Sequence, residues 1–455
     1  MDSKKTELFE NYSIPRAVAA LSVPTVLSTL VMVLYNIADT YFVGMLNSET
    51  QSAAVTLAAP MLLAFNAINN LFGVGGSSMM SRSLGRKDYD TVKKCSSFCF
   101  YCAAASGLII SIVVTLFKSG FLSLLGADEQ TAAATAEYLM WTVSFGAAPA
   151  ILNVVLSNMI RSEGASMNAG IGVMSGCILN IILDPFFVLP RFLGMGAAGA
   201  GLATFISNSA ACLYFFVLIF IRRKTTCVSL SPRDFVIRRD IVKEVFGVGV
   251  PASVQNLLNV TGTVILNNFT AEFGAEAVSA MGIAHKINMI PMYVCMGITQ
   301  GIMPLVSYNY SSGNRKRMRD AVVFVAKISV VLALCMTAVI FIFSGDLVRL
   351  FMDNDAIVAY GGILLREMSI GIIFLGADFL AVAIFQATGK GMYSFVFAIM
   401  RKLLLEIPAI IILNKVYPLY GMGYAAVCAE VVLAVAAVIM LRRIMNEKTE
   451  PVKTK

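Results

Sequence analysis

Carboxylates that stand inside long apolar runs are the residues of this sequence best suited to do chemistry. Asp39 lies in such a run near the N-terminus, and Tyr35 and Asn36 precede it by four and three residues, so they share its face of a helix. A charge within a membrane is costly and usually functional. We therefore expect Asp39 to bind an ion, with Tyr35 and Asn36 beside it. The alternative is a solvated, idle carboxylate at the outer end of its helix.

A second carboxylate, Asp184, has a similar setting. Asn180 lies one helical turn before it, and Pro185 follows it directly, which frees a backbone carbonyl oxygen one turn back. Thr204 lies in a later apolar run, after small residues that permit close helix approach. Together with Asp39, these side chains predict either an all-oxygen Na⁺ site or a carboxylate pair that shares one proton. The alternative for Asp184 is a plain helix end near the membrane interface.

The second half of the chain carries one deeply placed carboxylate, Asp378. It is flanked by apolar or small residues and cannot easily reach an interface, so we expect it to act near a bound substrate. Its counterpart in the first half is Asn153. Glu406 has Arg401 and Lys402 within reach on its own helix, which favours a structural ion pair at that position.

Several kinds of chemistry are excluded. No phosphate-binding loop of the form G-x-x-x-x-G-K-[ST] occurs. A membrane enzyme needs reactive groups clustered at one depth, and the single histidine cannot supply them; His285-Lys286 fits either a structural lysine paired with a carboxylate or a gating role. Cys95, Cys99 and Cys102 share a helical face, but free cysteines pack as small apolar residues. We expect no enzyme activity and no cofactor, so the energy for any work would come from an ion gradient.

The elements that must position these residues are membrane-spanning helices. Of the 455 residues, 58% are hydrophobic and 14% charged, against about 25% charged in a soluble domain. Several stretches free of Asp, Glu, Lys and Arg reach the ~20 residues that a helix needs to cross the hydrocarbon core. Twelve apolar spans are predicted, centred near residues 31, 66, 106, 148, 177, 208, 257, 292, 333, 371, 404 and 432.

The basic residues are distributed unevenly between the two sets of loops. Most fall in alternate loops that include both ends of the chain, whereas the remaining loops hold only Lys118, Arg191, Arg349 and Lys415. Because loops rich in Lys and Arg stay in the cytoplasm, both termini are predicted to be cytoplasmic.

The chain contains an internal repeat, in which the second half matches the first at an offset of about 225 residues. Val23-Pro24 aligns with Val250-Pro251, and Gly194-Met195-Gly196 aligns with Gly421-Met422-Gly423. An all-α membrane protein of twelve helices follows, in two six-helix lobes related by a pseudo-two-fold axis along the membrane normal. The predicted divisions are an N-lobe over 1–224, a cytoplasmic linker over 225–240 and a C-lobe over 241–455.

Four motifs together resemble the multidrug and toxic compound extrusion (MATE) family, and its MepA-like and DinF-like bacterial branch in particular. They are Leu21-Ser22-Val23-Pro24, Asn36-Ile37-Ala38-Asp39-Thr40-Tyr41-Phe42-Val43-Gly44, Ser83-Leu84-Gly85-Arg86-Lys87-Asp88 and Gly194-Met195-Gly196-Ala197-Ala198-Gly199. The resemblance implies export of organic cations in exchange for H⁺ or Na⁺. It also implies a coupling site at the positions that match Asp39, Asn180, Asp184 and Thr204.

The same resemblance assigns roles to other residues. The first-helix proline that bends in the family matches Pro24, and the tyrosine beside the coupling site matches Tyr35. NorM-type members carry a glutamate on the seventh helix where this chain has Asn259, although their tenth-helix aspartate matches Asp378. The first-half site is therefore the expected coupling site.

The sequence predicts a secondary active antiporter that works by alternating access. It would export organic cations, drugs or other amphiphilic small molecules in exchange for H⁺ or Na⁺, as a monomer in contact with the lipid of a bacterial plasma membrane, with no nucleic-acid partner. The alternatives are a flippase for lipid-linked glycans and an exporter of one narrow, unknown metabolite.

Overall fold

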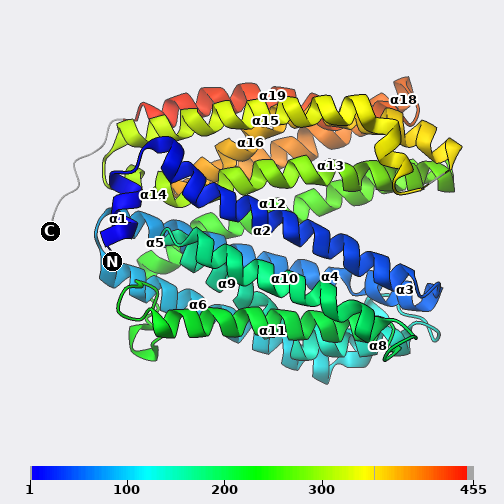
Figure 1. The fold of residues 1–455 in the computed structure, drawn as a ribbon, viewed down its shortest axis with the longest axis horizontal. Helices are drawn as coiled ribbons and strands as arrows, with labels where there is room; N and C mark the ends of the chain where they lie inside the picture. Colours follow the sequence, from blue (N-terminus) through cyan, green and yellow to red (C-terminus); the bar gives the residue numbers. More distant parts are fainter. Residues whose placement is uncertain (1–2, 353, 448–455) are drawn as a thin grey trace. The chain divides into compact units, whose positions relative to one another are not determined.

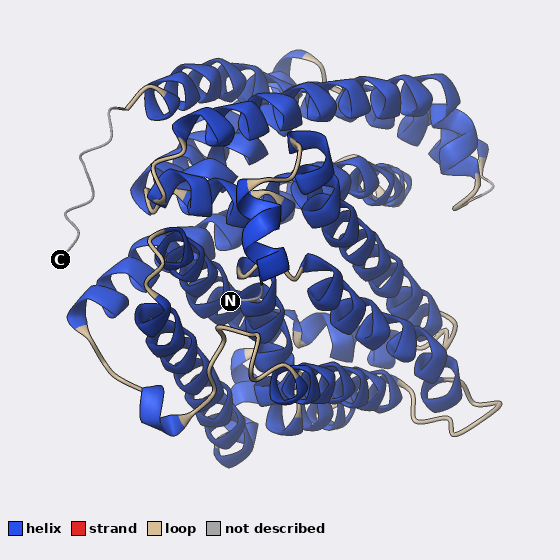
Figure 2. Ribbon diagram, turned by 60° about the vertical axis from the view of Figure 1, so that its left-hand side comes forward, coloured by secondary structure: helices blue, strands red, loops and turns tan. Residues whose placement is uncertain are grey.

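A computed structural model describes residues 3–352 and 354–447 of the chain. Figure 2 shows helices and loops, and no strand occurs within these two ranges. The all-helical fold class predicted from the apolar runs is confirmed.

Figure 1 labels most of the α-helices along the chain. In the first half they are α1 (Ser3–Glu10), α2 (Ile14–Gly44), α3 (Glu49–Leu57), α4 (Ala59–Ile68), η1 (Asn69–Val74), α5 (Gly75–Gly85), α6 (Tyr89–Leu116), α7 (Lys118–Leu124), α8 (Ala132–Leu139), η2 (Met140–Phe145), α9 (Ala147–Ser162), α10 (Ser166–Val188) and α11 (Ala197–Ile221). In the second half they are η3 (Pro232–Asp234), α12 (Arg239–Ala271), α13 (Ala275–Gly301), α14 (Met303–Ser311), α15 (Arg315–Arg349), α16 (Asp355–Ala387), α17 (Gly391–Ile399), η4 (Met400–Glu406), α18 (Ile407–Val416) and α19 (Gly421–Met445).

Helical segments occupy all twelve predicted spans. Nine helices in the described ranges are long and apolar enough to cross a membrane, and a tenth span is complete when α8–η2 and α9 are joined across a 48° bend. The remaining two spans are less apolar. One is α12, which carries the amides of Gln255, Asn256 and Asn259; the other is α17–η4–α18, which carries the charges of Arg401 and Glu406.

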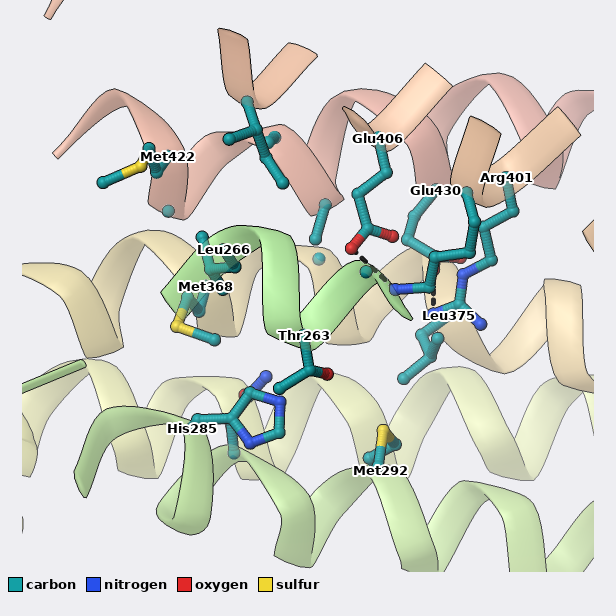
Figure 3. A pocket seen from close by; sticks show the side chains of 18 of the residues that line it. Thr263, Leu266, His285, Met292, Met368, Leu375, Arg401, Glu406, Met422 and Glu430 are labelled. Atoms are coloured by element: carbon teal, nitrogen blue, oxygen red, sulfur yellow. Dashed lines mark hydrogen bonds and ion pairs between the residues drawn. The ribbon is translucent and has the colours of Figure 1, made fainter. Parts of the chain in front are cut away.

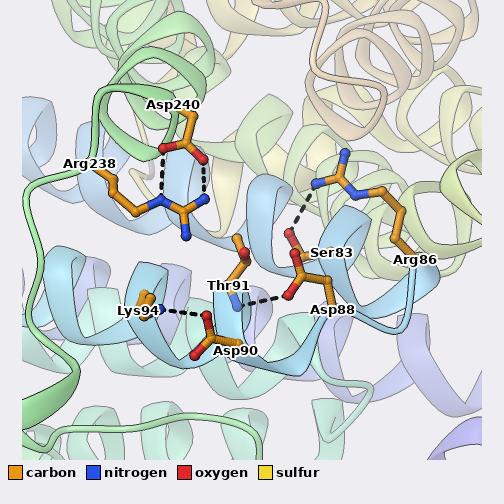
Figure 4. Close-up of polar contacts among 8 residues, drawn as sticks. All are labelled: Ser83, Arg86, Asp88, Asp90, Thr91, Lys94, Arg238 and Asp240. Carbon is orange, nitrogen blue, oxygen red and sulfur yellow. Dashed lines mark hydrogen bonds and ion pairs between the residues drawn. The ribbon is translucent and has the colours of Figure 1, made fainter. Parts of the chain in front are cut away.

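The internal repeat is visible in local backbone structure. Lys87 has a positive φ of 61°, and the next residue, Asp88, caps α6 by accepting a hydrogen bond from the Thr91 amide at 3.0 Å (Figure 4). Gly313 has a φ of 81°, and Asn314 caps α15 in the same way. The two caps fix the register in which α6 corresponds to α15, with N-caps at residues 88 and 314.

The chain packs into two compact units, which are described separately. Unit 1 comprises residues 1–11 and 27–253, and unit 2 comprises residues 12–26 and 254–455. The divisions within α2 and α12 follow shortly after Pro24 and Pro251, so each first helix of a half begins in the unit that holds the other half. The predicted lobe boundaries at 224 and 241 stay predictions, since they divide the chain by its repeat and not by its packing.

The starts of α2 and α12, each of which belongs to the unit that holds the other half, make specific contacts. In unit 1, Glu244 of α12 pairs with Arg82 of α5 at 3.0 Å, and the Ser253 hydroxyl donates to a carbonyl oxygen of α4 at 2.6 Å. In unit 2, the Ser22 hydroxyl of α2 donates to the Ile298 carbonyl oxygen of α13 at 3.1 Å. These bonds hold the two segments within their respective units.

The linker, residues 225–240, packs on unit 1. Ser97 and Tyr101 of α6 donate hydrogen bonds to linker carbonyl oxygens at 2.9 and 3.0 Å. Glu163, which is buried, accepts hydrogen bonds from the Thr226 hydroxyl at 3.0 Å and from the Cys227 amide at 2.9 Å. Residues 226–231 of the linker are therefore tied to the surface of α6 and to the α9–α10 turn.

Candidate functional site

Three polar side chains of α10 and α11 meet inside unit 1. Asn180 and Asp184 lie one turn apart on α10 and are 1% and 0% exposed. When the Asn180 side-chain amide is oriented so that both its oxygen and its nitrogen form hydrogen bonds, the nitrogen donates to Asp184 Oδ2 at 2.9 Å. Its oxygen then accepts from the main-chain nitrogen of Thr204 at 3.1 Å and from the Thr204 hydroxyl at 3.3 Å. The amide thus links the carboxylate of one helix to the hydroxyl of the next.

Close approach of α10 and α11 makes this contact possible. A Cβ on Gly199 would collide with the carbonyl group of Phe187, and a Cβ on Gly176 would touch α11 at the Ala211 side chain, at 3.1 Å. Small residues therefore let the two helices come near enough for short polar side chains to bridge them.

The first helix supplies the rest of this group. Tyr35 and Asp39 of α2 are half-buried, and both lie within electrostatic range of Asp184; the Tyr35 hydroxyl also lies beside Thr204. Asp184 Oδ1 is buried and has no hydrogen-bond partner among the described residues. The structure thus brings together Tyr35 and the four predicted coupling residues.

The oxygen-rich composition of this group decides what it can hold. Carboxylates, an amide oxygen and hydroxyls are ligands that suit hard cations. No grouping of three or more His, Cys, Asp or Glu side chains that could hold a metal ion occurs in the described ranges. A site with two carboxylates and neutral oxygens fits one monovalent cation or one shared proton better than a divalent metal.

The other predicted site residues lie elsewhere. Asn36 is exposed, and its amide donates to the Met32 carbonyl oxygen of its own helix at 2.7 Å. Asn153 of α9 is buried in unit 1 and donates to the Asn208 side chain of α11 at 3.1 Å. Pro24 is buried within α2, in the segment that belongs to unit 2.

Asp378 belongs to a buried network of charges in unit 2. Arg401 contacts Glu430 Oε1 at 2.6 Å and Asp378 Oδ2 at 3.5 Å. Lys402 pairs with Glu406 at 2.6 Å, which confirms the local ion pair predicted within that helix. All five residues are less than a tenth exposed. The two cations and three carboxylates come from α16, η4 and α19.

A cavity of about 100 Å³ adjoins this network (Figure 3). Arg401, Glu406 and Glu430 line its charged end, and Met368 is among the apolar residues of the rest of the wall. His285 also faces the cavity, whereas the neighbouring Lys286 is exposed. Methionine walls adapt their shape readily, so the cavity is suited to hold a small, partly apolar group.

The sequence interpretation missed that Asp378, Arg401 and Glu430 act together. The signal that was present is three ionisable residues, each inside an apolar run and each on a different predicted span. A buried charge needs a partner, so such residues are best paired across spans when no partner is available nearby in the sequence.

Comparisons with known proteins agree on one family. The family model described as MatE matches residues 24–186 and 251–412, one stretch in each half. The multidrug export protein MepA of Staphylococcus aureus is 33% identical over 451 residues, covering 99% of this chain and 98% of its own. MepA of Staphylococcus haemolyticus is also 33% identical, over 452 residues with the same coverage. A solved outward-facing multidrug resistance MATE family transporter of the MOP superfamily superposes with a TM-score of 0.92, at 25% identity and 98% coverage of both chains.

Proposed function

Since this chain belongs to the MatE family and is a multi-pass membrane transporter with the family's twelve-helix, two-lobe architecture, we propose that it is a secondary antiporter that exports organic cations or other amphiphilic small molecules in exchange for H⁺ or Na⁺. It is a transporter and not an enzyme. The observation that carries the proposal is the group of oxygen ligands in unit 1, where the half-buried Asp39 lies within electrostatic range of the fully buried Asp184.

The coupling ion binds at Asp39, Asn180, Asp184 and Thr204. Two carboxylates close together repel one another, and no ion pair joins Asp39 or Asp184 to a cation of the described ranges. Uptake of one proton or one Na⁺ removes most of that repulsion. The unpartnered Asp184 Oδ1 is the atom that gains a partner in either case.

Ion binding is expected to act through α2. Asp39 lies on that helix, and Pro24 leaves one of its backbone carbonyl groups without a donor, which makes the helix easier to bend there. One elementary charge moving down a potential of 100 mV supplies roughly 2.3 kcal/mol, enough for about fiftyfold accumulation. Release of the carboxylates from repulsion would let α2 adopt a second shape and change access to the site.

The cargo is proposed from the relatives and from charge. The relatives that cover nearly the whole chain are named multidrug export proteins. A site whose carboxylates lack fixed counter-ions attracts cations and disfavours anions. Organic cations and amphiphiles with a cationic group are the matching cargo. The excess of basic residues in alternate loops favours both termini on the cytoplasmic side of a bacterial plasma membrane.

The test is ethidium efflux from energised cells that express equal amounts of each variant. Asp39→Asn and Asp184→Asn are expected to abolish efflux, because each removes a carboxylate of the pair. Thr40→Val is the matched control, since Thr40 neighbours Asp39 but is exposed and donates only to its own helix at 2.9 Å.

The coupling ion follows from the same assay. A protonophore that stops efflux in Na⁺-free medium identifies H⁺, and efflux that needs external Na⁺ identifies Na⁺. Export by Asp39→Asn and Asp184→Asn at the parent rate would show that this site does not couple transport.

A further inference from the structure

A groove runs along the outside of unit 2, between α15 and the start of α2. It has a volume of about 450 Å³ and is lined by Ile14, Arg319, Asp320, Val323, Phe324 and Lys327. Arg319 and Lys327 are exposed and flank the apolar part of the groove. No hydrogen bond or ion pair joins the side chain of either cation to another residue in the described ranges. The groove therefore combines two unpaired cations with an apolar floor.

The position of the groove along α15 relates it to the membrane surface. Residues 328–345 of this helix carry no charge, and at a rise of 1.5 Å per residue they extend about 27 Å, close to the ~30 Å of the hydrocarbon core. Lys327 thus lies at one edge of the hydrocarbon. Arg319 lies two turns beyond it, about 12 Å further out and at the depth of lipid headgroups.

The equivalent surface of unit 1 is occupied. In the register fixed by the two N-caps, Ser97 and Tyr101 of α6 correspond to Val323 and Lys327 of α15. Both α6 side chains donate hydrogen bonds to the linker, which covers them. In the described part of unit 2 no hydrogen bond or ion pair ties another segment to Val323 or Lys327. The helix is thus present in both halves of the repeat, but the linker that covers it in unit 1 has no equivalent at Val323 and Lys327 in the described part of unit 2.

We propose that this groove binds an anionic glycerophospholipid. The phosphate lies between Lys327 and Arg319, and an acyl chain packs on Phe324 at the hydrocarbon edge. The cations exceed the one groove carboxylate, Asp320, so an anion is preferred over a zwitterion. Basic side chains at the edge of the hydrocarbon, beside an apolar surface, match the two ends of such a lipid. The proposal requires the chain to lie in a bilayer but is independent of its cargo and coupling ion.

The test is native mass spectrometry of the purified full chain in detergent, titrated with phosphatidylglycerol or phosphatidylcholine of identical acyl chains. Each cation near the membrane surface contributes about a fivefold gain in affinity for an anionic lipid, so the pair is expected to give about a thirtyfold preference for phosphatidylglycerol. Arg319→Gln/Lys327→Gln should abolish the preference, and Lys327→Arg should retain it. Lys316→Gln is the matched control, because Lys316 is exposed on the first turn of α15 but does not line the groove.

Two further variants separate the contributions within the groove. Asp320→Asn removes the opposing charge and should tighten phosphatidylglycerol binding. Phe324→Ala should weaken both lipids equally, because it removes acyl-chain contact and leaves the charges. If the double variant fails to fold, Arg319→Gln and Lys327→Gln alone should each lose about fivefold of the preference.

Three results would overturn the proposal. One is equal binding of the two lipids to the parent protein. A second is a folded double variant that keeps the preference for phosphatidylglycerol. The third is binding of glycerol phosphate as tight as that of the lipid, which would make the groove a site for a soluble phosphate.

Discussion

Removal of the Arg401 guanidinium is the most direct perturbation of unit 2. Arg401 contacts Glu430 at 2.6 Å and Asp378 at 3.5 Å, and the two carboxylates are 2% and 1% exposed. Arg401→Met keeps the apolar stem but leaves two buried carboxylates without their cation. Loss of one partner of a buried ion pair costs about 3–5 kcal/mol, because the remaining charge stays desolvated. Because Arg401→Met leaves two buried carboxylates without this cation, its cost in stability is expected at the upper end of that range.

The cost is large enough to be measured as a melting temperature. For a folding unit of about 150–250 residues, which is the size of unit 2, 1 kcal/mol corresponds to roughly 2–4 °C. At the upper end of the range of about 3–5 kcal/mol, Arg401→Met should therefore melt roughly 10–20 °C below the parent in the same detergent. The assay follows the fraction of monodisperse protein that survives heating. Arg349→Met is the control arginine: its partner is Asp355 at 2.6 Å, but the two side chains are 53% and 94% exposed, so less than about 1 kcal/mol is expected.

A double variant tests whether the contact itself carries the effect. Glu430→Gln removes one of the stranded charges, so Arg401→Met/Glu430→Gln should recover stability relative to Arg401→Met. Residues in contact typically couple by about 0.5–3 kcal/mol. If Arg401→Met melts within about 2 °C of the parent, or if the two substitutions are additive, the network does not stabilise unit 2 and the reasoning is wrong.

Three further predictions concern unit 1. Gly249→Ala should destabilise the protein by about 1–3 kcal/mol, because its Cβ would press on a backbone carbonyl of η1, whereas a Cβ at Gly247 meets open space and Gly247→Ala should be neutral or stabilising in the same melting assay. The hydrogen bond from Arg238 lowers the pKa of Asp240 in the linker (Figure 4), so the stabilisation by this bond is present above the unfolded-state pKa and is lost as the pH falls through the folded-state pKa. For so exposed a pair this stabilisation is less than about 1 kcal/mol. The difference in melting temperature between Asp240→Asn and the parent should therefore be small at about pH 7 and shrink towards about pH 3. Glu163→Leu should release the linker and speed its cleavage by trypsin, and unchanged cleavage would show that these hydrogen bonds do not hold it.

The fold could be predicted from the sequence because its signals are local. The length of an uncharged run decides whether a helix crosses the membrane, and a repeated motif such as Gly194-Met195-Gly196 with Gly421-Met422-Gly423 needs no knowledge of packing. The polar pair of α10 was equally accessible, since Asn180 and Asp184 are one helical turn apart. The Lys402–Glu406 pair follows the same i,i+4 spacing.

Packing across helices could not be predicted in this way. Asp378, Arg401 and Glu430 are separated by more than twenty residues from one to the next, and no periodicity relates helices that meet only in three dimensions. The same is true of the passage of α2 and α12 from one unit to the other after Pro24 and Pro251. The contacts that define it, such as Ser22 with Ile298, join residues more than 160 positions apart.

The two halves of the repeat handle buried charge differently, and this difference bears on function. Where unit 2 has Asp378 beside Arg401, the corresponding residue of unit 1 is Asn153, which forms a neutral amide pair with Asn208. Unit 1 instead places Asp39 and Asp184 together with no ion pair to a cation of the described ranges, whereas the carboxylates of unit 2 share Arg401 and Lys402. A protein-borne cation already neutralises much of the second site, so an arriving ion gains less there. The charge that changes during a transport cycle is therefore expected in unit 1, and substitutions of the unit 2 network should affect stability before they affect coupling.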